Sequence, residues 1–132
     1  MKKIIYLVAI VVLSTLTAAT FSEKGKKPKP KFQRIVAFKF KADASDNARK
    51  KHMKEFEVFA KGLKQVLSYR AGKTVKGESA DVGEYDVMHY ITFEKETDII
   101  VYDEHPSHKK FIEENKESWE KVLAIKIGRA NV

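Results

Sequence analysis

Short segments rich in apolar residues are interleaved with longer segments that have an apolar residue every three or four positions. The short segments predict strands, which cover about residues 33–41, 67–76, 85–94 and 122–129. The first of them has no cleanly polar face and the last is apolar on both faces, so both faces are expected to be covered. The longer spacing predicts helices, which cover about residues 46–61, 97–104 and 106–119. This order is the ferredoxin-like β-α-β-β-α-β pattern, an α+β fold with one antiparallel four-stranded sheet.

Capping residues indicate where the predicted helices begin and end. Ser45 or Asp43 is expected to cap the first helix, and Gly62 to end it in the left-handed conformation. Thr97 is expected to cap the second helix. Pro106 should start the third, because a proline disfavours helical backbone in the residue before it.

The first helix and second strand carry two further expectations. The buried stripe of the helix is expected to consist of Met53, Phe56, Ala60 and Leu63. A glycine inside a strand often marks a bulge or a close backbone approach, and Gly72 is expected to have that role.

Helices on one face of the sheet would leave its other face uncovered. That face is expected to carry Ile35, Ala37, Met88, Tyr90, Leu123, Ile125 and Ile127. So apolar a patch is unusual on a monomer, and a domain of about 100 residues has only a marginal core of its own. We therefore expect a homodimer in which two sheets pair face to face into an α/β barrel.

The N-terminus has the composition of a secretory signal peptide. Lys2 and Lys3 precede an apolar run over 4–16, and small residues at 17–19 offer a cleavage site. An uncleaved membrane anchor is the alternative, but it would need about 20 apolar residues. We expect cleavage near Ala19 and a periplasmic or secreted protein without a stable membrane anchor. The chain contains no cysteine for a lipid anchor or a disulfide.

The chain divides into a signal peptide over 1–19, a lysine- and proline-rich linker over 20–31 and a folded domain over 32–132. The whole chain has a net charge of +8, but residues 32–132 hold 19 Lys and Arg against 17 Asp and Glu. Phosphate recognition needs a basic face. Nucleic-acid binding is therefore not expected.

The segments RIVAFKFK, ITFE, YDEHPSHKKF and SWEKVLAIKI, with Ser45 before the first helix and Gly72 in the second strand, resemble the stress-responsive α/β barrel (Dabb) family of dimeric ferredoxin-like domains. The likeness covers about residues 33–127 and is most specific in YDEHPSHKKF. It implies a homodimer and, in each subunit, a pocket between the helices and the sheet.

In the family's plant polyketide-cyclising branch, a tyrosine and a histidine of this block carry acid/base chemistry, and they match Tyr102 and His108. A histidine suits that work because its reference pKa is about 6.5. The alternatives are a core tyrosine and a satisfied helix histidine. His105 is expected to serve the joint between two helices by bonding the backbone. This chain departs from that branch at Val87, where the branch has a further histidine.

The side chains expected to line the pocket are Arg34, Val36, Phe38, His52, Phe56, His89, Phe111 and Trp119. An arginine and two histidines are unusual on apolar faces, because an unpaired buried charge is costly. In one interpretation, Arg34 reaches solvent and His52 only flanks the buried stripe. In the functional interpretation, these residues form a polar cavity for a small anionic or phenolic ligand.

Neither a metal nor a cofactor is expected. His105 and His108 straddle a helix start rather than sharing one helical face, and no cysteine adds a ligand. Two functions stay open. The favoured one is an exported dimer that binds a small molecule, and the other is a cofactor-independent, cyclase- or isomerase-like enzyme. In the enzyme, His108 would be the base, with Tyr102 and Arg34 as oxyanion partners.

Overall fold

The structure is a computed structural model that describes residue 25 and residues 29–75 and 84–128. The expected signal peptide, most of the expected linker, the last residue of both the second and the fourth expected strands, and residues 77–83 and 130–132 of the expected domain lie outside the described residues. None of the helices in the described part of the chain is long and apolar enough to cross a membrane.

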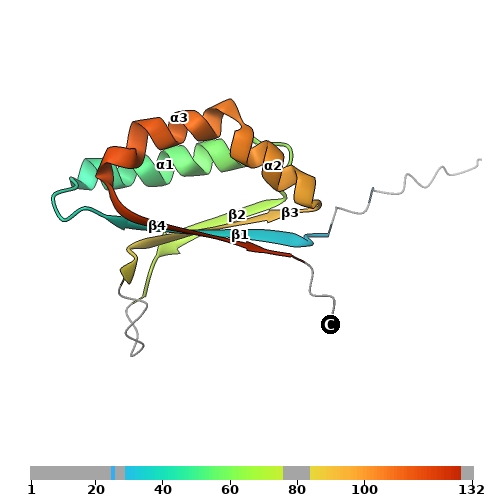
Figure 1. The fold of residues 1–132 in the computed structure, drawn as a ribbon, viewed down its shortest axis with the longest axis horizontal. Helices are drawn as coiled ribbons and strands as arrows, with labels where there is room; N and C mark the ends of the chain where they lie inside the picture. Colours follow the sequence, from blue (N-terminus) through green and yellow to red (C-terminus); the bar gives the residue numbers. More distant parts are fainter. Residues whose placement is uncertain (1–24, 26–28, 76–83, 129–132) are drawn as a thin grey trace, which may run out of the picture.

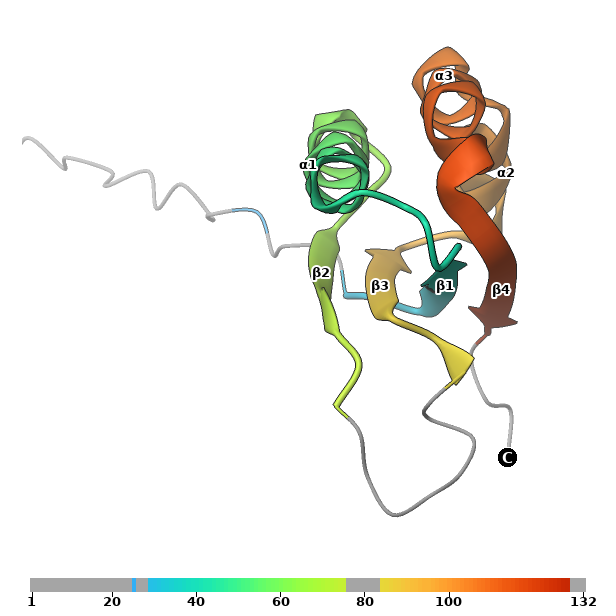
Figure 2. The same cartoon turned by 90° about the vertical axis from the view of Figure 1, so that its left-hand side faces the viewer.

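The strands and helices follow one another in the predicted order. They are β1 (Phe32–Phe40), α1 (Asp46–Gly62), β2 (Ser68–Lys73), β3 (Val87–Phe93), α2 (Glu96–Glu104), α3 (Pro106–Asn115) and β4 (Trp119–Ile127), with a 3-10 turn over Lys116–Ser118. The sheet has the order β2-β3-β1-β4, and every neighbouring pair is antiparallel. The helices lie on one face of this sheet (Figures 1 and 2), so the ferredoxin-like prediction is confirmed.

The first helix begins as expected and ends differently. The Ala48 backbone N–H donates to Ser45 Oγ over 3.1 Å, which identifies Ser45 as the N-cap. Gly62 is the last residue of α1, but none of the described glycines has a positive φ. The helix ends instead because Leu63 takes an extended conformation, with φ −92° and ψ 127°.

The two C-terminal helices meet at His105, which is both the C-cap of α2 and the N-cap of α3. Its Nδ1 accepts a hydrogen bond from the Ser107 backbone N–H over 3.2 Å, and Pro106 is the first residue of α3. Both expectations for this joint are confirmed. The cap of α2 is Lys95 rather than Thr97.

The buried stripe of α1 is rotated from the expected one. His52 and Phe59 are buried with Phe56 and Ala60, whereas Met53 is only half-buried. The helix packs against the sheet on one side and against α3 on the other, which widens the stripe that it must bury (Figure 2). This rotation brings an imidazole into the core.

The irregular point of the sheet is not Gly72. The β2–β3 register runs without a shift, and a Cβ at Gly72 would meet nothing within 4 Å. The shift lies instead between Lys39 and Phe40, where Trp119 of β4 pairs with Phe40. The Trp119 ring packs on Phe38, with 4.7 Å between ring centroids.

The sheet face away from the helices is apolar, as expected. Five of its large side chains are 37–43% exposed, namely Met88, Tyr90, Leu123, Ile125 and Ile127. Ile35 and Ala37 also lie on this face, as expected, but Ile35 is half-buried and Ala37 is 0% exposed. Ala37 is a small side chain in the central strand β1, and the longer Met88 and Leu123 flank it in the register. We call the five exposed residues the open sheet face.

Candidate functional site

Four ring side chains are joined by hydrogen bonds across the core. Trp119 Nε1 donates to His52 Nδ1 over 3.0 Å. His52 Nε2 lies 3.0 Å from His89 Nε2, and His89 Nδ1 lies 2.9 Å from the Tyr69 hydroxyl oxygen. The four residues come from β4, α1, β3 and β2, so each of these elements contributes one member. We call Trp119, His52, His89 and Tyr69 the ring chain.

Aromatic side chains enclose the two histidines of the ring chain, and both histidines are 0% exposed. Phe56 stacks on His89 with 3.8 Å between ring centroids. The Phe38 ring meets His52 at 4.5 Å and His89 at 5.5 Å, both edge to face. Burial disfavours the charged form of an imidazole. It lowers the pKa of His52 to about 4 and, with the charge on His52 adding to it, the pKa of His89 to about 3.

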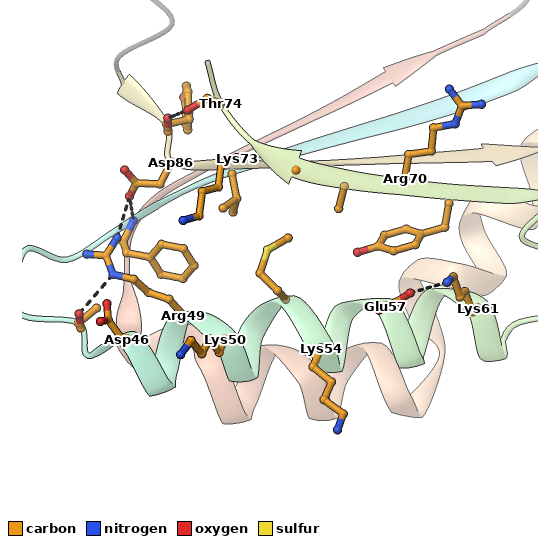
Figure 3. Close-up of a pocket in the computed structure, with 18 of the residues that line it drawn as sticks. Asp46, Arg49, Lys50, Lys54, Glu57, Lys61, Arg70, Lys73, Thr74 and Asp86 are labelled. Carbon is orange, nitrogen blue, oxygen red and sulfur yellow. Dashed lines mark hydrogen bonds and ion pairs between the residues drawn. The ribbon is translucent and has the colours of Figure 1, made fainter. Parts of the chain in front are cut away.

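Tyr69, at the β2 end of the ring chain, lines a groove between α1 and β2 with a volume of about 1160 Å³ (Figure 3). Its lining includes Phe40, Met53, Glu57, Tyr69, Ala71, Lys73, Tyr85 and Asp86. Six lysines and arginines line it against three acidic residues. Burial, followed by the nearby charge of Glu57, raises the pKa of Tyr69, so its hydroxyl keeps its proton at neutral pH.

An ion pair lies at one end of the groove (Figure 3). Arg49 Nη1 lies 3.7 Å from Asp86 Oδ2, and the same carboxylate oxygen accepts from the Phe40 backbone N–H over 2.8 Å. Lys73 extends from β2 toward α1 near this pair, whereas Arg70 and Lys54 point away from the groove (Figure 3). The cationic groups at this end of the groove therefore come from both of its walls.

A second polar cluster surrounds Tyr102 of α2. The His108 ring lies 5.1 Å from the Phe59 ring and 4.9 Å from the Tyr102 ring, and His108 Nδ1 lies 2.9 Å from the Asp103 carbonyl oxygen. A carbonyl oxygen only accepts, so Nδ1 carries a proton. Tyr102 is fully buried, and its hydroxyl has no hydrogen-bond partner among the described residues.

Arg34 belongs to this second cluster. Its Nη2 lies 3.1 Å from Asp103 Oδ1, and its guanidinium lies 5.8 Å from the centre of the Tyr102 ring. No hydrogen bond of good geometry reaches Asp103 Oδ1 or Arg34 Nε among the residues described. Burial raises the pKa of Tyr102, while the Arg34 charge opposes that rise. We call Arg34, Tyr102, Asp103 and His108 the Tyr102 cluster.

The residues singled out from the sequence fall into two groups. Tyr102, His108 and Arg34 meet in the Tyr102 cluster. The others lie in the centre of the fold: Val36, Phe38, His52, Phe56, His89, Phe111 and Trp119. None of them lines the groove between α1 and β2.

Sequence reasoning missed Tyr69, the residue that connects the core to the groove. A local signal exists, because Tyr69, Ala71 and Lys73 alternate along β2 and all three line the groove. The sequence does not show that His89 is the hydrogen-bond partner of Tyr69. Tyr69 and His89 are 20 positions apart and meet only when β2 and β3 pair.

Within the ranges 29–75 and 84–128, no group of three or more His, Cys, Asp or Glu side chains is placed to hold a metal ion. Nε2 of His52 and Nε2 of His89 are hydrogen-bonded to each other.

The antiparallel sheet, the single layer of helices and the helix joint at His105 identify a ferredoxin-like α+β domain. The family model for the Stress responsive A/B Barrel Domain (Dabb) matches residues 32–127. The chain belongs to this family. No curated protein matches it.

Solved structures share the fold. A protein from Arabidopsis thaliana, At3g17210, is 23% identical over 76% of this chain and 97% of its own, with a TM-score of 0.68. A dimeric ferredoxin-like protein of unknown function from Thermobifida fusca is 14% identical over 78% and 94%, with a TM-score of 0.65. A hydroxynitrile lyase from Passiflora edulis is 16% identical over 79% and 98%, with a TM-score of 0.68.

The buried histidines make the stability of the domain pH-dependent. Their folded-state pKa values lie below the unfolded value of about 6.5, so the unfolded chain binds more protons between these limits. Stability is therefore full above about pH 6.5 and is lost as the pH falls toward the folded-state values. Between pH 7 and pH 5 we expect a loss of about 2 kcal/mol for each histidine.

Urea unfolding at both pH values measures this loss. The variant His52→Gln removes one titrating ring and keeps an amide that can bond to His89. It should lose about half of the pH dependence. An unfolding free energy that is equal at pH 5 and pH 7 in the parent protein would contradict the assignment of two neutral buried histidines.

Proposed function

We propose that the protein is an exported homodimer that binds a small organic molecule in the groove between α1 and β2. We assign it no reaction. The observation that carries the proposal is the position of Tyr69, which lines a groove of about 1160 Å³ and is hydrogen-bonded to His89 of the buried ring chain. Ligand sites are concave and hold a few well-placed polar groups.

Dimerisation is supported by the open sheet face and by relatives. The five exposed apolar residues share the open sheet face, and the helices lie on the other side of the sheet (Figure 1). Large exposed apolar patches mark interaction sites. The protein from Thermobifida fusca that shares the fold is dimeric. A second copy of this chain is therefore the occupant that we propose for the open sheet face.

A second candidate function is acid/base catalysis at the Tyr102 cluster. It is favoured by the Tyr102 hydroxyl, which is buried without a partner among the described residues. The structural relative from Passiflora edulis is a hydroxynitrile lyase, but so distant a likeness supports only the fold. A substrate could reach this hydroxyl only if the side chains around it moved, because Tyr102 is fully buried. We therefore rank this function second.

Filling the groove should abolish binding. Ala71 pairs with His89 in the register, so its side chain faces the helices, and Ala71→Trp would place an indole in the groove. We expect aromatic fragments to shift amide NMR signals of β2 and α1 in the parent protein and to bind at least tenfold more weakly to this variant. The fragments should include anionic, neutral and cationic members.

Val58→Trp is the matched control, because Val58 is 66% exposed and lies outside this groove. It should bind the fragments as the parent does. Shifts confined to the residues around Tyr102 and His108 would favour the second candidate. If no fragment of any charge shifted the groove signals, the binding proposal would be wrong.

Ile125→Asp tests the dimer. A carboxylate at this position would be buried without a partner in a sheet-to-sheet interface, which costs about 3–5 kcal/mol. We expect the dimer dissociation constant to rise more than a hundredfold, measured by analytical ultracentrifugation. Val58→Asp, on the outer side of α1, should leave the dimer intact. A parent protein that is monomeric at micromolar concentration would refute this interface.

Export is tested by the mass of the mature chain. The cationic start, the apolar run and the small residues at 17–19 predict cleavage near Ala19. Intact-mass spectrometry of the protein from its native cell envelope or medium should find a chain that begins near Thr20. A full-length species in the cytosol as the main form would contradict export.

A further inference from the structure

The direction of every hydrogen bond in the ring chain follows from its first member. The indole Nε1 of Trp119 is a donor only, so His52 Nδ1, 3.0 Å away, must be an unprotonated acceptor. A neutral imidazole carries one proton. The proton of His52 is therefore on Nε2, the atom that faces His89.

The same reasoning passes to the next ring. His52 Nε2–H donates to His89 Nε2 over 3.0 Å, so His89 Nε2 is unprotonated and the proton of His89 lies on Nδ1. His89 Nδ1–H then donates to the Tyr69 oxygen over 2.9 Å. The reverse direction is excluded by geometry, because it would put a proton on His52 Nδ1 opposite the N–H of Trp119.

The last member is left with one proton to donate. The Tyr69 oxygen accepts from His89, and in the described part of the chain His89 is the only hydrogen-bond partner of this hydroxyl. The Tyr69 side chain lines the groove. We infer that the ring chain fixes the Tyr69 hydroxyl as a hydrogen-bond donor into the groove, and that the groove selects a small aromatic molecule carrying an oxygen anion, a carboxylate or a phenolate.

This inference rests on the proposed binding groove and adds the class of its ligand. Three observations agree on that class. The raised pKa of Tyr69 keeps its proton in place at neutral pH. Of the lining cations, Arg49 and Lys61 are paired with Asp86 and Glu57, but Lys73 extends from β2 toward α1 with no ion-pair partner among the described residues (Figure 3). Phe40 and Met53 add apolar surface for a ring.

In this arrangement Tyr69 is the residue that touches the ligand. Trp119, His52 and His89 are positioning residues, because they act only through the hydroxyl that they orient. Because the hydroxyl oxygen already accepts a hydrogen bond from His89, its proton is the group directed at the ligand, which favours a ligand that offers an acceptor. Buried residues of the ring chain thus determine which ligands the Tyr69 hydroxyl can bind.

The tautomers can be measured without any ligand. Long-range ¹H–¹⁵N NMR spectra of the purified protein at pH 7 distinguish protonated from unprotonated ring nitrogens. We expect His52 to be the Nε2–H tautomer and His89 the Nδ1–H tautomer. Trp119→Phe removes the donor that sets the direction, so the His52 signals should then show a mixture or the other tautomer. An Nε2–H tautomer of His89 in the parent protein would overturn the inference.

The ligand class is measured with benzoate as the anionic probe and benzylammonium as its cationic counterpart, both at millimolar concentration. We expect benzoate to shift the groove amides and benzylammonium to leave them unchanged. Tyr69→Phe should weaken benzoate binding about tenfold or more, because it removes a hydrogen bond to a charged group. Tyr90→Phe, the same substitution at a tyrosine of the open sheet face, outside the groove, should change it less than threefold.

The outcomes separate this inference from the proposed function. If neutral or cationic fragments bind in the groove and benzoate does not, the binding groove stands and the ligand class is wrong. If benzoate binds equally well to the parent and to Tyr69→Phe, the donor role of Tyr69 is refuted even when the tautomers are as expected. If no fragment binds in the groove, the proposed function fails, and the ligand class fails with it.

Discussion

The hydrogen bond from Trp119 to His52 is the interaction on which the polar interior depends. Two neutral imidazoles in an aromatic core present four ring nitrogens, and each unpaired one would cost about 1–3 kcal/mol. The ring chain satisfies all four, because β4, α1, β3 and β2 bring one partner each. This arrangement needs the register shift between Lys39 and Phe40, where Trp119 pairs with Phe40 beside the core. The register shift in the sheet therefore helps to place the hydrogen-bond donor of the core histidines.

The Tyr102 cluster is the opposite case within the same domain. Arg34 and Asp103 form an ion pair, yet Arg34 Nε, Asp103 Oδ1 and the Tyr102 hydroxyl have no hydrogen-bond partner among the described residues. Half-satisfied buried polar groups cost stability and mark places of strain or function. One polar system is thus complete and ends at a groove, whereas the other is incomplete and enclosed. This contrast is why we place ligand binding at Tyr69 and rank catalysis at His108 second.

The sequence predicts the fold far better than the site, for a physical reason. Element order, the Ser45 cap and the Pro106 helix start depend on contacts between near neighbours, and all of them are confirmed. The helix ends at Gly62 without a left-handed residue, because tertiary packing lets Leu63 leave the helix in an extended conformation. The rotation of the α1 stripe, which buries His52 and leaves Met53 half-buried, depends on α3 packing beside α1.

The site could not be predicted from the sequence because its hydrogen-bond partners are far apart in the chain. Trp119 and His52 are 67 positions apart, so no local pattern relates them. His52 and His89 could be recognised as unusual on apolar faces, but not as partners.

Strand β3 connects the two surfaces to which we assign functions. Side chains alternate between the faces of a strand, so His89 enters the ring chain while its neighbours Met88 and Tyr90 lie on the open sheet face. A second copy seated on that face would cover Met88 and Tyr90 and restrain β3. It would not obstruct the space between α1 and β2, which lies on the helical side of the sheet (Figures 1 and 3). Dimerisation should therefore hold in place the strand that carries His89, and with it the donor orientation of Tyr69, without closing the groove.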